Sequence, residues 1–195
     1  INITPVNDAP VLGAVPAQST EEDVPRVIPI MVSDDVTPGA FLSVAATSSN
    51  TNLFPLGSLS ISNDAGVFTL HAHPASNGVG VAMITLVATD PQALSSSNSF
   101  VLTVNPVNDP PTISAIAAQT VNEDTNGLLI SLVVDDFETL AGNLVLSPST
   151  SNPGLIPRAN LVLGGTGANR TLTIATAPDQ SGAATSSVTV RDEGG

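Results

Sequence analysis

A short junction word occurs twice in the sequence, as Thr4-Pro5-Val6-Asn7-Asp8-Ala9-Pro10 and as Asn105-Pro106-Val107-Asn108-Asp109-Pro110-Pro111. Proline fixes φ and has no backbone N–H, so a segment of this kind is typical of an extended connector rather than the middle of a sheet. The two copies lie 101 residues apart (Asn7 to Asn108), which is the size of one ordinary domain. The 195-residue chain is therefore predicted to hold tandem modules joined by this connector.

Acidic and amide residues recur in register between the two halves of the sequence. A shift of 101 places Asn7-Asp8 on Asn108-Asp109, Glu22-Asp23 on Glu123-Asp124, and Asp34-Asp35 on Asp135-Asp136. After a slip of one residue, a shift of 102 places Leu70 on Leu172 and Asp90 on Asp192. The acidic positions match better than the apolar positions between them, which indicates a divergent duplication.

The pattern between these acids is that of short strands separated by turn clusters. Val27–Ser33 and Leu128–Val134 are apolar runs of strand length, and apolar residues alternate with polar ones around Leu70 and Ile84. Asn63-Asp64-Ala65-Gly66 and Asn126-Gly127 are turn sequences. No stretch has helical periodicity with caps, so we predict an all-β fold of two tandem β-sandwich modules.

The ends of the chain are out of phase with the modules. We predict the tail of a preceding repeat and a linker at 1–8, repeat one at 9–106, a linker at 107–111, and an incomplete repeat two at 112–195. Ile1 and Ile3 correspond to Leu102 and Val104 of the closing strand, and repeat two has no counterpart of that strand. An unpaired edge favours strand addition from a neighbour, and a chain that is one piece of a longer protein explains it equally.

Charge excludes several classes of partner. Seventeen acids face four bases, giving a net charge of −13, which argues against nucleic acid and anionic membrane surfaces and favours cations. No cysteine is present for a disulfide or a thiolate metal site, and the apolar run Val79–Ala88 is too short for a membrane span. No nucleophile elbow or phosphate-binding loop occurs, so no enzyme activity and no catalytic residues are expected.

Several longer words carry a family resemblance. Val6-Asn7-Asp8-Ala9-Pro10, Glu123-Asp124-Thr125, the run 151–157 (Ser-Asn-Pro-Gly-Leu-Ile-Pro) and the run 167–174 (Gly-Ala-Asn-Arg-Thr-Leu-Thr-Ile) resemble cadherin-like and Ig-like tandem repeats of large bacterial surface or secreted, adhesin-type proteins. The resemblance covers nearly the whole chain. It implies Ig-like or cadherin-like sandwiches, an extracellular or cell-surface location, and a structural role.

The resemblance also implies calcium at each inter-repeat junction. Carried over residue by residue, the complete junction uses Glu22, Asp23, Asn108, Asp109, Asp135, Asp136 and Asp192. Half of a second junction remains in Asn7, Asp8, Asp34, Asp35 and Asp90, and half of a third in Glu123, Asp124 and Asp179. Asn77 stands at the turn where cadherins carry an Asp-Arg-Glu word, so a cadherin-type cluster of several ions is not expected in full.

The chemistry of these residues agrees with that implication. Calcium takes about six to eight oxygen ligands and prefers carboxylates and carbonyls. Carboxylates that converge on one seam repel each other unless a cation neutralises them, so the ion is expected to stiffen the junction. The alternative is that these acids are solvated turn residues, a common use of Asp and Asn. A zinc site at His71 and His73 is a weaker hypothesis, because both side chains are expected on an outward strand face.

We therefore predict structural spacer repeats of an extracellular bacterial adhesin-type protein, rigidified by Ca2+ at the junctions. The alternative function is a carbohydrate-binding or self-associating module that forms a fibre or surface layer. The expected partners are neighbouring repeats of the same chain, with identical chains or glycans under the alternative.

Overall fold

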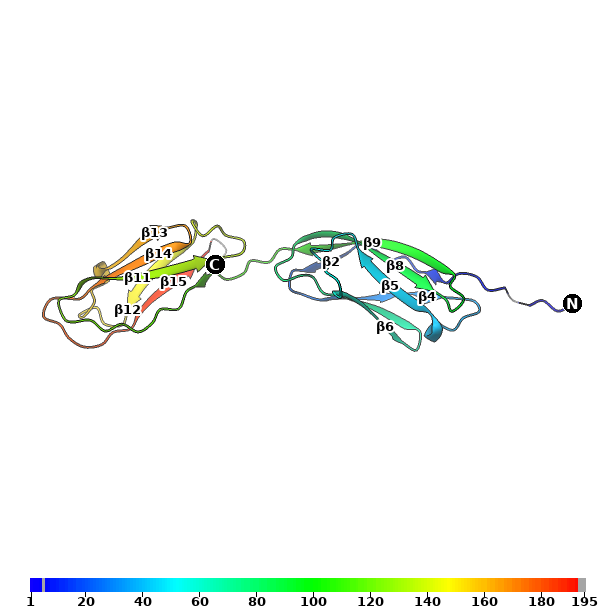
Figure 1. Cartoon of the computed structure of the whole chain (residues 1–195), viewed down its shortest axis with the longest axis horizontal. Helices are drawn as coiled ribbons and strands as arrows, with labels where there is room; N and C mark the ends of the chain where they lie inside the picture. The colour runs from blue at the N-terminus through cyan, green and yellow to red at the C-terminus, as the bar shows by residue number, and fades with distance from the viewer. Residues whose placement is uncertain (5, 193–195) are drawn as a thin grey trace. The chain divides into compact units, whose positions relative to one another are not determined.

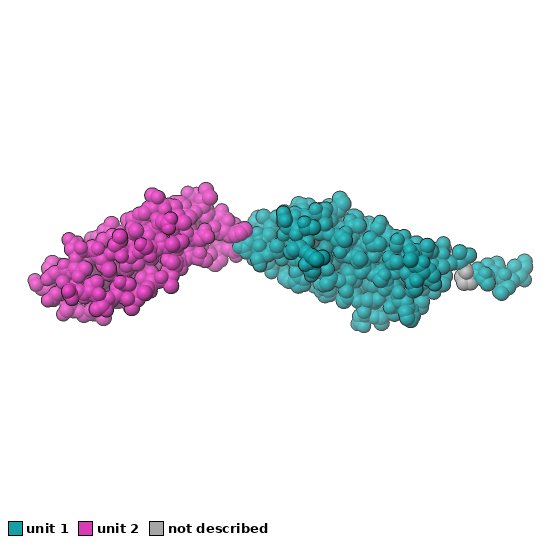
Figure 2. Space-filling view, viewed as in Figure 1, with its two compact units in different colours: residues 1–107 teal, residues 108–195 magenta. Residues whose placement is uncertain are grey.

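The computed structural model describes residues 1–4 and 6–192. Residues 193–195, at the end of the predicted second module, lie outside the described residues. The chain divides into two compact units, unit 1 (Ile1–Val107) and unit 2 (Asn108–Gly195) (Figure 2). Apart from the 3-10 segments η1 (Gly39–Phe41) and η2 (Arg158–Asn160), the regular structure of the described residues is β-strand.

Unit 1 is a sandwich of two sheets (Figure 1). One sheet has the order β2-β9-β8-β5, from β2 (Gln18–Glu21), β9 (Ser95–Asn105), β8 (Gly80–Thr89) and β5 (Ser43–Ser48). The other has the order β3-β7-β6, from β3 (Arg26–Ile30), β7 (Val67–Ala72) and β6 (Leu59–Asp64), beside the short pair β1 (Val11–Leu12) and β4 (Val32–Ser33). All pairings are antiparallel except β2 with β9, which run parallel.

The alternation in the sequence sets the core of unit 1. Strand β8 buries every second residue, and β7 and β9 do the same over their apolar stretches. The predicted inward residues are buried: Phe68, Leu70, Ala72, Ala82, Ile84, Leu86, Ala88, Phe100, Leu102 and Val104. Because successive side chains of a strand point to opposite faces, this one face of each strand supplies the apolar layer between the sheets.

Unit 2 keeps a counterpart of the β3-β7-β6 sheet of unit 1, whereas its counterpart of the β2-β9-β8-β5 sheet is reduced (Figure 1). Its larger sheet has the order β10-β11-β14-β13, from β10 (Thr112–Ile113), β11 (Asn126–Asp135), β14 (Asn169–Ala175) and β13 (Leu161–Thr166). Its other sheet has only β12 (Val145–Thr150) and β15 (Ser186–Arg191). Among residues 108–192, no strand corresponds to β9, and 119–122, the counterpart of β2, form no strand. The all-β, Ig-like and cadherin-like sandwich fold predicted from the sequence is confirmed.

A β-bulge accounts for the slip between the repeats. The register of β11 against β14 shifts between Asn126 and Leu128, where Gly127 has a φ of +101°. A bulge adds one residue to one strand, and glycine tolerates this left-handed backbone. The prediction of a turn at Asn126-Gly127 is wrong, since both residues belong to β11. The offset is therefore already 102 before Asp34, so the counterpart of Asp34 is Asp136 rather than Asp135.

Candidate metal-binding ends of the two units

Asn7 and Asp90 meet at one end of unit 1 although 83 residues separate them. Asn7 Nδ2 donates to Asp90 Oδ2 at 2.5 Å. The Asn7 amide oxygen, Oδ1, is buried and has no hydrogen-bond partner among the described residues. An amide oxygen in this position is an acceptor that the described protein atoms leave unused.

The loop after β8 holds the Asp90 carboxylate in place. Asp90 is only 5% exposed, and its Oδ1 accepts the backbone N–H groups of Gln92 and Leu94, each at 2.9 Å. The loop closes through Ala93, whose φ is +68°. These two charge-assisted hydrogen bonds from backbone N–H groups fix the carboxylate, and its other oxygen, Oδ2, faces Asn7.

Asp34 occupies a similar loop after β4. Its Oδ1 accepts the N–H groups of Thr37 at 2.6 Å and of Val36 at 2.9 Å, and these two bonds lower the pKa of the Asp34 carboxyl below its usual value. Its Oδ2 is buried without a hydrogen-bond partner in the described part of the chain. The neighbouring Asp35 and the linker residue Asp8 are exposed. Asp34 is thus held ionised near neutral pH with one oxygen uncommitted.

Unit 2 repeats both arrangements. Asn108 Nδ2 donates to Asp192 Oδ2 at 2.7 Å, as Asn7 does to Asp90. Asp136 Oδ1 accepts the N–H groups of Glu138 at 3.1 Å and Thr139 at 2.6 Å, and its Oδ2 is buried with no hydrogen-bond partner among residues 1–4 and 6–192. Asp135 is exposed, and its Oδ1 accepts the N–H of Asp136 at 3.1 Å.

Glu138 adds a carboxylate that the sequence comparison missed. Its Oε2 accepts the backbone N–H of Asp109 at 3.2 Å, so it ties the linker to the loop of Asp136. Its counterpart in unit 1 is Val36, an apolar residue, so no acid recurs there to draw attention to it. The only signal was an acid two residues after Asp136.

At the other end of unit 1, Glu22 is buried. It is 4% exposed, its Oε1 accepts the N–H of Val107 at 2.7 Å, and its own N–H donates to Asn105 O at 2.9 Å. Its Oε2 is buried with no partner in the described residues. The exposed Asp23 has a φ of +56°, and its Oδ1 accepts the N–H of Asn77 at 3.2 Å.

The matching end of unit 2 keeps one half of this arrangement. Asp124 Oδ1 accepts the N–H of Asp179 at 2.9 Å, and both residues have positive φ, as Asp23 and Asn77 do. Glu123 is exposed, unlike its counterpart Glu22. Glu22 is covered by the end of β9 and the residues after it, and the described part of unit 2 has no such segment.

The predicted ligands of the complete junction are divided between the two units. Glu22 and Asp23 lie in unit 1, whereas Asn108, Asp109, Asp135, Asp136 and Asp192 lie in unit 2. Within the described residues, no three His, Cys, Asp or Glu side chains come together as a metal-binding group. At the weaker zinc candidate, His71 Nε2 lies 3.2 Å from Ser62 Oγ. The ligand set of the junction remains a prediction.

Comparison with known proteins shows similarity at the level of fold. No protein-family model matches the chain, and no curated protein sequence gives a significant match. Titin domains Z1Z2 in complex with telethonin are 14% identical, with a TM-score of 0.42 over 94% of this chain and 95% of that chain. Protocadherin gamma B7 cadherin domains 1–4 are 18% identical, with a TM-score of 0.44 over 94% and 48%. Domains 1–6 of surface layer protein SbsC are 12% identical, with a TM-score of 0.41 over 90% and 22%.

None of the helical segments in residues 1–4 and 6–192 has the length and apolar character needed to cross a membrane.

Proposed function

We propose that the chain consists of spacer repeats of an extracellular surface protein, of the bacterial adhesin type that the sequence resembles, and that Ca2+ at the inter-repeat junctions makes the spacer rigid. The observation that carries the proposal is a set of unused oxygen atoms. Seven buried side-chain N or O atoms of the described residues have no hydrogen-bond partner, and four of them belong to predicted ligands: Asn7 Oδ1, Glu22 Oε2, Asp34 Oδ2 and Asp136 Oδ2.

All four atoms are acceptors in an acidic chain. An unsatisfied buried polar atom costs about 1–3 kcal/mol, and a bound cation relieves that cost. Calcium fits this donor set because it binds carboxylate and amide oxygens in flexible geometry. Magnesium fits less well, since it demands a near-ideal octahedron and keeps most of its water.

The residues prepare the site without the ion. In Asp34, Asp136 and Asp90 one carboxylate oxygen is held by two backbone N–H groups, which leaves the other oxygen fixed in direction. In Glu22 the fixed oxygen is bound by the N–H of Val107. Little side-chain freedom is lost on binding, which favours affinity.

The proposed ligands of the complete junction are Glu22, Asp23, Asn108, Asp109, Asp135, Asp136 and Asp192, with Glu138 as an addition. The half-sites are Asn7, Asp8, Asp34, Asp35 and Asp90 at one end and Glu123, Asp124 and Asp179 at the other. When bound, calcium supplies positive charge that neutralises these carboxylates. Asn108 and Asp109 belong to the linker itself, so their coordination removes freedom from the connector between the units.

Small-angle X-ray scattering of the full chain in calcium and in chelator tests this role. The proposal predicts a narrower distribution of interdomain distances in calcium. The matched variant Asp64→Asn, which removes an exposed acid at the end of β6 outside the predicted set, should respond as the unaltered chain does. Equal flexibility with calcium and with chelator would rule out the rigid-spacer role.

A further inference from the structure

Two Asn-Gly dipeptides occur in the chain, Asn77-Gly78 in unit 1 and Asn126-Gly127 in unit 2. In such a pair the backbone nitrogen of the glycine can attack the side-chain amide carbon of the asparagine, because glycine has no side chain to hinder the approach. The attack requires the peptide unit between the two residues to turn, so its rate depends on how firmly the fold holds that unit. The structure holds the two pairs very differently.

Asn126-Gly127 lies at a weak point of β11. Asn126 is the first residue of the strand, and Gly127 is the extra residue of the bulge, with no residue opposite it on β14. Both residues are exposed, and a Cβ added at Gly127, whose φ is +101°, would meet no atom within 4 Å. The end of a strand beside a bulge opens locally at low cost, because few contacts are lost.

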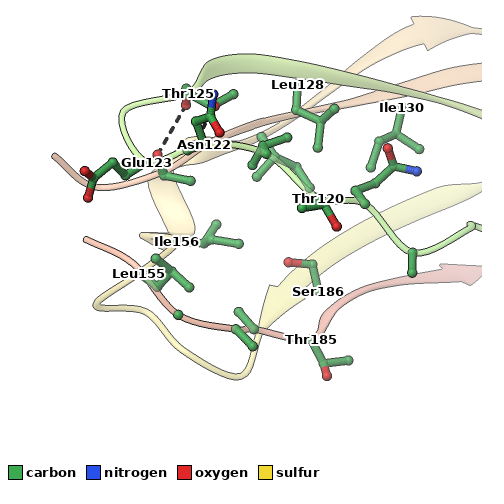
Figure 3. Close-up of a pocket in the computed structure, with 18 of the residues that line it drawn as sticks. Thr120, Asn122, Glu123, Thr125, Leu128, Ile130, Leu155, Ile156, Thr185 and Ser186 are labelled. Atoms are coloured by element: carbon green, nitrogen blue, oxygen red, sulfur yellow. Dashed lines mark hydrogen bonds between the residues drawn. The ribbon is translucent and has the colours of Figure 1, made fainter. Parts of the chain in front are cut away.

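The residues on either side of this pair are held in place. Thr125 Oγ1 donates to Asn122 O at 2.7 Å in the turn that leads into β11, as the dashed line in Figure 3 marks. On the other side, Leu128 lines the pocket drawn in Figure 3 and packs, partly buried, against the core of unit 2. Asn126 and Gly127 can therefore move while the turn and the rest of the strand stay folded.

Asn77-Gly78 is held by its turn. The Gly78 N–H donates to Ala75 O at 2.9 Å, and the Asn77 N–H donates to Asp23 Oδ1 at 3.2 Å. A Cβ at Gly78 would lie 2.6 Å from Ala75 O, so the backbone of the turn is closely packed. The nitrogen that would attack is thus engaged in a hydrogen bond, and the peptide unit cannot turn without opening the loop.

We propose that Asn126 is a site of spontaneous deamidation in the folded protein and that Asn77 is protected from it. The Gly127 nitrogen gives its proton to water and bonds to Cγ of Asn126, and the side-chain amide leaves as ammonia. Water then adds to one carbonyl of the resulting succinimide ring and breaks one of its two C–N bonds, which yields aspartate or isoaspartate at position 126. Each conversion consumes one water and replaces a neutral amide with a carboxylate, two residues after Asp124. The inference does not depend on the calcium proposal.

Peptide mapping by mass spectrometry tests the proposal on the full chain, incubated in chelator at mildly alkaline pH. Conversion at Asn126 should be at least about tenfold faster than at Asn77, a ratio that corresponds to about 1.4 kcal/mol in the cost of local opening. Enzymatic methylation of isoaspartate gives an independent readout. In urea, where the turn and the bulge are both lost, the two pairs should convert at similar rates.

The variant Asn126→Gln is the matched control. It keeps an amide at the site but requires a larger ring for the same attack, so the isoaspartate signal of the folded chain should disappear. A signal that persists in this variant would overturn the assignment to Asn126. So would an Asn126 that stays intact in the folded chain while it converts in urea, or conversion of Asn77 as fast as that of Asn126 in the folded chain.

Discussion

Replacement of Asp90 by alanine isolates the structural value of one predicted calcium ligand. The Asp90 carboxylate is 5% exposed and accepts three N–H groups, from Gln92 and Leu94 at Oδ1 and from Asn7 at Oδ2. Asp90→Ala leaves the two backbone donors without an acceptor, at about 1–3 kcal/mol for each buried donor. Asn7 is half-buried and can turn to water, so its loss adds little. The expected loss of unfolding free energy for unit 1 is roughly 2–6 kcal/mol, the sum for the two donors.

The control is Asp90→Asn, which keeps Oδ1 and both backbone hydrogen bonds. It should cost less than about 1 kcal/mol, because only the charge and the bond to Asn7 change. Urea unfolding in chelator measures both variants without any metal contribution, and the transition of unit 2, with Asp192 unaltered, serves as the internal reference.

Two outcomes would refute this reasoning. If Asp90→Ala unfolds at the same urea concentration as the unaltered chain, the three hydrogen bonds give no net stability. If Asp90→Asn is as costly as Asp90→Ala, the charge rather than the accepted hydrogen bonds stabilises the loop.

Three further predictions concern other positions. The pKa of Asp34 is lowered in the folded state, so the stability that its carboxylate contributes is complete above about pH 4 and is lost as the pH falls through the folded-state pKa. In acid unfolding, the stability of Asp34→Asn should therefore depend less steeply on pH in this range than that of the unaltered chain. An unchanged pH dependence would contradict the prediction. Ala65 has a φ of +50° in the β6–β7 turn, ahead of Gly66 at +97°. Asparagine tolerates this left-handed backbone better than alanine, so Ala65→Asn should stabilise unit 1 by roughly 0.5–1 kcal/mol in thermal unfolding. Destabilisation would count against the turn assignment. Glu22→Gln keeps the acceptor for the N–H of Val107 but loses the anionic oxygen. If calcium then binds with a 100-fold weaker Kd, the stabilisation by calcium falls from about 2.7 to about 0.4 kcal/mol at a fixed calcium concentration. Undiminished stabilisation by calcium in this variant would remove Glu22 from the ligands.

The strands were predictable because their signal is local. The alternation around Leu70, Ile84 and Leu102 appears directly in the sequence, and each of these residues is buried as its position in the pattern requires.

The register and the detailed environments were not predictable, because they depend on distant partners. The slip at Gly127 follows from the pairing of β11 with β14, which no local pattern encodes. The burial of Glu22 depends on Val107, 85 residues away, and the role of Glu138 depends on Asp109. Sequence recurrence selected the candidate acids, but only the fold shows which oxygen atom of each acid already accepts a hydrogen bond from a backbone N–H.

The most direct test of the central claim is the melting temperature of the full chain in calcium and in chelator. A ligand at 100 times its Kd stabilises the folded state by about 2.7 kcal/mol, which raises the melting temperature of a domain of this size by about 10–20 °C. The account predicts such a rise for the unaltered chain and for Asp64→Asn, and its loss in Asp109→Asn/Asp135→Ala. A melting temperature that is the same in millimolar calcium and in chelator would contradict the account and return these acids to the role of solvated turn residues.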